Sequence, residues 1–93
     1  MLVKFVSVIR STNGTYTLKE VMINPKHIVF IEDDPAFERM LKEGKLPQGL
    51  LPEVKFTSIT MSDSPYSKRI VVIGSSSEVG SKIFQKSKQL LRG

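Results

Sequence analysis

The sequence has no cysteine, no tryptophan and a single histidine among its 93 residues. Disulfides and zinc sites built on thiolates are therefore excluded. The longest apolar runs, such as Ile28–Ile31, are far shorter than the roughly 20 residues of a membrane-spanning helix,. The first residues also lack the order of a signal peptide, in which positive charge precedes a long apolar stretch. Together these absences predict a cytoplasmic protein.

What is present is the composition of an ordinary globular domain, with 40% hydrophobic and 25% charged residues,. The length predicts one small domain spanning residues 1–93. The net charge of +5 is distributed unevenly. Residues 1–31 carry four bases and one acid, residues 32–53 three bases and six acids, and residues 54–93 seven bases and two acids. A basic balance of this kind can attract nucleic acid or another anionic partner.

The pair Asn13-Gly14 is the clearest local signal in the chain. It lies between two segments rich in Val, Ile and Phe, residues 2–10 and 16–23. Asn-Gly favours a type I′ turn, in which both residues have a positive φ. We therefore expect an antiparallel hairpin. A bulge or sharp bend is expected near Lys19-Glu20, because the apolar residues move there from even-numbered to odd-numbered positions,.

A third strand over 27–32 and a helix follow in the sequence. Asp34 suits the N-cap of this helix, Pro35 its first position and Gly44 its end,. The apolar residues at helical spacing, which we expect to be buried, are Phe37, Met40 and Leu41.

The second half predicts two more strands, over 54–61 and 68–73, and a helix over 77–91. This helix is amphipathic, with Ile83 and Phe84 in an apolar arc that we expect to be buried against the sheet. The order β-β-β-α-β-β-α predicts an α+β fold, in which a curved antiparallel five-strand sheet is covered by the C-terminal helix. Both an open sheet and a small closed barrel fit this pattern.

Three places carry chemically competent side chains, and each has a structural explanation. His27 has no evident nucleophile and acid beside it. The run Glu32-Asp33-Asp34 lacks the spacing of a calcium loop, and capping explains Asp34 while the helix dipole explains Asp33. The Gly74–Ser77 segment lacks a nucleotide-binding signature, and Ser75 with Glu78 forms a capping box. We therefore predict no catalytic residue, no metal site and no cofactor.

The best candidate for binding an anionic partner is the polar face of the last helix. Its bases are Lys82, Lys86, Lys88 and Arg92. Nucleic-acid sites usually combine such bases with aromatic side chains, which are few here. A solvated outer face explains the same pattern.

Several short motifs spread over most of the chain resemble the small bacterial flagellar and swarming-motility family of the FlbD type. They are Asn13-Gly14, Ile23-Asn24-Pro25, Ile28, Ile31-Glu32, Ile59, Ile70-Val71-Val72 and Ser76-Ser77-Glu78-Val79. Residues 33–52 differ from that family, which has a tight connection there, and small phage-encoded β proteins share motifs of this kind. The resemblance implies a non-enzymatic accessory protein that acts through contacts.

The sequence thus favours a small regulatory or accessory module that binds a protein partner, and a second copy of the chain counts among such partners. The alternative is a nucleic-acid-binding domain that uses the basic C-terminal helix.

Overall fold

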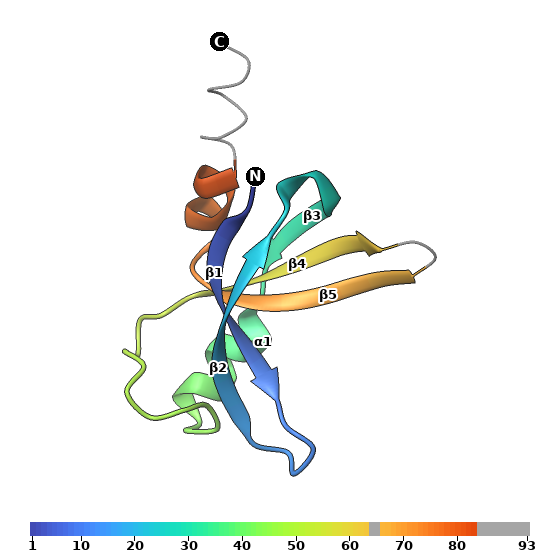
Figure 1. Ribbon diagram of the computed structural model, residues 1–93. Coiled ribbons are helices and arrows are strands. Elements are labelled where there is room, and N and C mark those ends of the chain that lie inside the picture. Colours follow the sequence, from blue (N-terminus) through green and yellow to red (C-terminus); the bar gives the residue numbers. More distant parts are fainter. Residues whose placement is uncertain (64–65, 84–93) are drawn as a thin grey trace.

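A computed structural model describes residues 1–63 and 66–83 of the chain (Figure 1). Its elements are β1 (Val3–Arg10), β2 (Tyr16–Ile23), the 3-10 helix η1 (Pro25–His27), β3 (Ile28–Asp33), α1 (Pro35–Lys42), β4 (Phe56–Asp63) and β5 (Tyr66–Ile73). A C-terminal helix begins at residue 76 and is described as far as residue 83. The predicted element order is confirmed, with η1 as an addition.

The five strands form one antiparallel sheet in the order β2-β1-β5-β4-β3. The two edge strands, β2 and β3, do not pair with each other in the described part of the chain. Of the two architectures that the sequence allowed, the open sheet is therefore the one that forms.

The sheet consists of two ladders that meet at one position. The β1–β2 and β4–β5 hairpins each pair over eight positions, whereas β1 pairs with β5 only at Ser7↔Val72. Figure 1 shows the two hairpins crossing steeply at this place. We call the Ser7↔Val72 pairing the crossing. The strong curvature expected from the sequence is concentrated there.

The first hairpin forms as predicted, but its turn differs. Gly14 donates its N–H to the Ser11 carbonyl (3.0 Å), and the Ser11 N–H donates to the Thr15 carbonyl (2.8 Å). Only Gly14 of the Asn-Gly pair has a positive φ (87°), so the type I′ prediction for Asn13 was wrong. The pattern is that of a three-residue loop ending in a left-handed glycine. The Asn13 side chain stabilises it by accepting the Thr15 N–H (3.2 Å).

Of the bulge or sharp bend expected near Lys19-Glu20, the bulge does not form. The β1–β2 register runs without a shift from Val3↔Ile23 to Arg10↔Tyr16. The apolar parity changes because the hairpin contributes to two cores on opposite faces of the sheet. A register shift occurs instead in β3, between Ile28 and Phe30.

One core lies under the C-terminal helix and the other under α1. The buried residues of the helix-side core are Val3, Phe5, Ile23, Ile59, Val72 and Val79. The α1-side core contains Val8, Leu46 and Phe56. Phe37, Met40 and Leu41, which we expected to be buried, pack against it and are half-buried. Ile83 packs against the helix-side core as expected, whereas Phe84 lies outside the described residues.

The ends of α1 follow the sequence signals. Asp34 accepts the Phe37 N–H (3.4 Å) as N-cap, and Gly44 (φ 74°) follows the last turn. Gly44 donates its N–H to the Leu41 carbonyl and Lys45 to the Met40 carbonyl, which is the Schellman pattern,. Both ends of the short helix are thereby capped.

Candidate functional site

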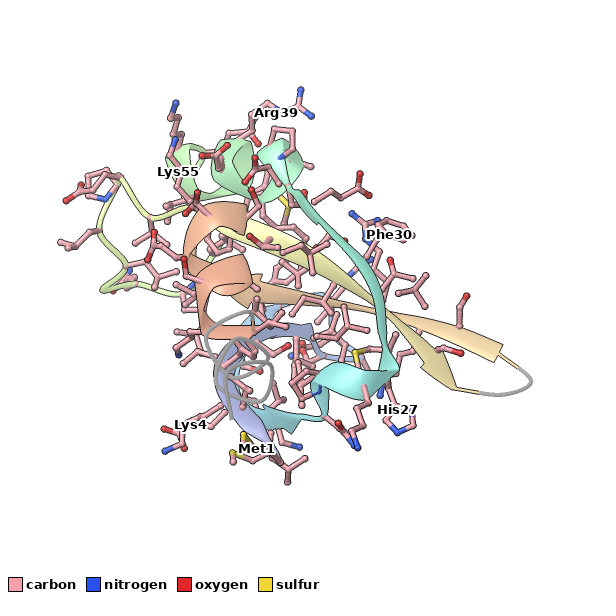
Figure 2. The ribbon with its side chains drawn as sticks, turned by 90° about the horizontal axis from the view of Figure 1, so that it is seen from above. Met1, Lys4, His27, Phe30, Arg39 and Lys55 are labelled. Carbon is pink, nitrogen blue, oxygen red and sulfur yellow. The ribbon has the colours of Figure 1, made fainter. Side chains whose placement is uncertain are left out.

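The polar candidates predicted from the sequence occupy three separate places. His27 is exposed in η1 and points away from the sheet (Figure 2). Ser75 and Glu78 form the predicted capping box, since the Glu78 N–H donates to Ser75 Oγ (3.1 Å) and the Ser75 N–H to Glu78 Oε1 (3.4 Å). Ser75 Oγ also donates to Glu78 Oε1 (3.1 Å), so both side chains are used within the capping box.

The acidic run divides its members between two structural roles. Asp34, only 4% exposed, caps α1 and also accepts a bond from the Arg69 guanidinium (2.9 Å). Asp33 accepts the Ser76 N–H (3.0 Å), so it caps the C-terminal helix, whereas the sequence assigned it to the dipole of α1. Among the residues that the structure describes, no group of His, Asp and Glu side chains could hold a metal ion.

Of the predicted basic face, only Lys82 lies within the described residues, and Lys86, Lys88 and Arg92 lie outside them. Lys82 is turned back toward the sheet. Its Nζ donates to the Lys4 carbonyl (3.1 Å) and lies 5.1 Å from the centroid of the Phe5 ring. This lysine therefore helps to hold the C-terminal helix on β1.

The sheet opens into a groove where β1 and β5 separate beyond the crossing. We call it the fork groove. It has a volume of about 380 Å³ and is lined by Ser7, Val8, Ile9, Lys19, Val21, Lys68, Arg69, Ile70 and Val71. No element of the described chain covers it. Because it depends on the pairing of two strands about 65 residues apart, no local motif marks it in the sequence.

Six of these residues share one face of the sheet. Side chains alternate between the faces along a strand. The registers Ser7↔Lys19 and Ser7↔Val72 therefore place the members on the same side. They are Ser7, Ile9, Lys19, Val21, Lys68 and Ile70. This face of the groove has an aliphatic floor between two lysines that come from different hairpins.

The charge of the fork groove is positive. Its lining contains three cations and no carboxylate. Arg69 is matched by Asp34, but neither Lys19 nor Lys68 has an ion-pair partner among the described residues. Ile9 is 37% exposed at this site. An apolar surface next to unpaired positive charge is thus open to a partner.

A second groove, which we call the helix groove, lies on the other side of the crossing, between β1 and the C-terminal helix. It has a volume of about 510 Å³. Its charged groups are already engaged within the chain. Lys82 bonds to the Lys4 carbonyl, Lys4 lies 3.8 Å from Glu20, and Glu78 belongs to the capping box. The fork groove, although smaller, is therefore the better candidate site.

Apolar side chains are also exposed on both edge strands. Val29 and Phe30 on β3 are 60% and 50% exposed, and Figure 2 shows Phe30 on the outer side of that strand. Leu18 and Met22 are exposed on β2. The registers place both of these on the face opposite Lys19, so they do not line the fork groove.

Comparison with protein-family models, with curated proteins and with solved structures finds no match. Within the described residues, no helix is long and apolar enough to cross a membrane.

Proposed function

We propose that this protein is a small, non-enzymatic accessory module that binds a protein partner through the fork groove. The observation that carries the proposal is the uncovered aliphatic floor between β1 and β5, two strands that pair with each other at one position only. Strands with unpaired edges accept extended segments of other chains, and side-chain pockets beside them supply specificity.

The lining of the groove favours a polypeptide over a nucleic acid. Bases bind single-strand sites by stacking on aromatic side chains. The floor is formed by aliphatic residues such as Ile9, Val21 and Ile70, and the groove's described lining includes no aromatic residue. The alternative of a nucleic-acid-binding helix has less support, because Lys82 is engaged with β1. The resemblance to the FlbD-type family implies the same non-enzymatic role and remains a prediction.

Site-specific photo-crosslinking tests the proposal. A photoreactive amino acid replaces Ile9 in the groove and, in a matched control, Leu18 on the opposite face, where the exposed fraction is similar (37% and 40%). We expect a protease-sensitive, nuclease-resistant adduct from position 9 in the native host. Excess wild-type protein should suppress it, whereas excess Ile9→Asp protein should not.

Two results would contradict the proposal. Equal adducts from positions 9 and 18 would mean that the groove has no special affinity. An adduct from position 9 that disappears on nuclease treatment would favour the nucleic-acid alternative.

A further inference from the structure

We infer that the partner segment which the fork groove accepts is extended and acidic, with aliphatic residues and Asp or Glu two positions apart, so that both lie on the same side of the segment. This inference rests on the proposed function and specifies its partner. It follows from the charge of the groove and from the geometry of its strands. It also follows from a comparison with the other side of the crossing, where the C-terminal helix packs into the angle between β1 and β5.

The charge of the groove comes from two unpaired lysines. Lys19 on β2 and Lys68 on β5 are exposed and have no ion-pair partner among the described residues. They share a face with Ile9 and Ile70. Complementary charge across an interface raises the association rate and selects partners. A segment that places carboxylates near both lysines is therefore favoured over a neutral or basic one.

The geometry of the strands requires the segment to be extended. Beyond the crossing, no further register position joins the residues after Ser7 to those before Val72. A third strand placed along either edge would gain backbone hydrogen bonds there, as in strand addition. Because side chains of a strand alternate between its faces, every second residue of such a segment would meet the aliphatic floor.

On the other side of the crossing, the C-terminal helix packs into the angle between β1 and β5, and its contacts show what kind of segment this sheet binds. There the C-terminal helix places Val79, 1% exposed, in the helix-side core. The same helix places the Lys82 amine on a backbone carbonyl of β1. An apolar anchor beside a charged side chain thus occupies part of that angle from within the chain, and the helix groove lies beside it. The fork groove offers an aliphatic floor with positive charge, so its occupant needs the opposite charge and comes from another chain.

Selection from a displayed library of random peptides against the full-length protein tests the inference. We expect the enriched peptides to be acidic, with aliphatic residues and carboxylates two positions apart, because the lysines and the aliphatic floor share one face,. A synthetic copy of an enriched peptide should bind more weakly at physiological than at low salt, because exposed charge pairs are screened. Its affinity should fall about fivefold to thirtyfold in Lys19→Glu/Lys68→Glu, as expected for the loss of two exposed ion pairs.

Lys26→Glu/Lys42→Glu is the matched control, since it changes the net charge equally at exposed lysines outside the groove. It should leave the affinity within about twofold, the range expected for charges far from the site. Thermal melts of both double variants establish that they remain folded.

The outcomes separate this inference from the proposed function. Enriched peptides that are neutral or basic, but whose binding is abolished by Ile9→Asp, would overturn the acidic partner and leave the groove as a protein-binding site. Enrichment that Ile9→Asp does not affect would overturn both. A complex of the protein with a labelled poly(dT) oligonucleotide that is tighter than micromolar and depends on Lys19 and Lys68 would also overturn both.

Discussion

The two sides of the crossing use the same strands differently. On one side, Phe5 of β1 lies under the C-terminal helix and is 3% exposed. On the other side, Ile9 of the same strand and the same face is 37% exposed and lines the fork groove. Four residues of β1 thus separate a surface that the chain covers itself from one that it leaves open. The comparison teaches that one strand contributes to the core at one end and leaves an apolar side chain exposed at the other, where we propose that a partner binds.

The largest expected effect is at the covered end. Phe5→Ala should lower the free energy of unfolding by about 3 to 5 kcal/mol, because it removes a buried ring and leaves a cavity under the helix. Ile9→Ala should cost less than about 1 kcal/mol, since the side chain is already partly in water. Urea denaturation of the two variants measures both values. Similar losses would break the comparison, because Ile9 would then belong to the core.

A smaller effect is expected where the rim of the fork groove joins α1. Asp34 both caps α1 and binds Arg69 of the groove. Asp34→Ala should therefore cost about 1 to 3 kcal/mol, from the lost cap and the lost charged partner. Asp34→Asn should cost less, because an amide oxygen can still accept the Phe37 N–H. Equal costs for the two variants in denaturant melts would show that the cap contributes little.

The sequence predicted most of the elements because their signals are local. The hairpin at Gly14, the N-cap at Asp34 and the capping box at Ser75 each depend on residues within a few positions of one another. The turn at Asn13 was predicted with the wrong φ because two hairpin loops accept the same dipeptide. Here Asn13 Oδ1 accepts hydrogen bonds from Ser11 and Thr15, and these bonds favour the three-residue loop.

The site was not predictable in the same way. The crossing joins Ser7 and Val72, and nothing near either residue indicates the partner. The one signal we noted was the change in β2 from apolar even-numbered to apolar odd-numbered positions, which we interpreted as a bulge or sharp bend. It marks instead a hairpin that serves two cores, with Ile23 in one and Tyr16 packed against the other. Lys19, at the change of parity, is the residue that this arrangement directs into the groove.

The connection between β5 and the C-terminal helix lies on the covered side of the crossing and contains Gly74. Gly74 has a φ of 126°, and a Cβ there would lie 3.4 Å from Val79 Cγ2. Gly74→Ala should cost about 1 to 2 kcal/mol from backbone strain. Gly49→Ala is the control, since Gly49 also has a positive φ but no atom within 4 Å of an added Cβ. In thermal melts, a larger loss of stability for Gly74→Ala than for Gly49→Ala would measure how closely the helix packs against Gly74. Equal losses would mean that the strained backbone φ accounts for the whole effect.

Lys82 and Lys68, which lie on opposite sides of the crossing, should also differ in how much they stabilise the fold. Lys82→Met should destabilise the fold by about 0.5 to 1 kcal/mol, because it removes the bond to the Lys4 carbonyl and the contact with the Phe5 ring. Lys68→Met should change stability by less than about 0.5 kcal/mol, as expected for an exposed side chain that has no ion-pair partner among the described residues,. Chemical denaturation at physiological salt measures both. A destabilisation by Lys68→Met as large as that by Lys82→Met would mean that Lys68 has a structural role, and it would weaken the case for a free positive charge in the groove.

The smallest expected effect concerns a lysine away from both sides of the crossing. Lys55 lies 2.7 Å from Glu38 of α1 (Figure 2), and this bond raises the pKa of Lys55 above its ordinary value of 10.5. A pKa that is higher in the folded state stabilises the fold at pH values below the unfolded pKa, and this contribution is lost as the pH rises through the folded pKa. Stability should therefore decline slightly more steeply above about pH 10.5 in the wild type than in Lys55→Gln. Glu38→Gln should reduce the alkaline decline in the same way, because it removes the carboxylate that bonds to Lys55. An alkaline decline that is unchanged in both variants would mean that the contact between Lys55 and Glu38 contributes nothing to stability.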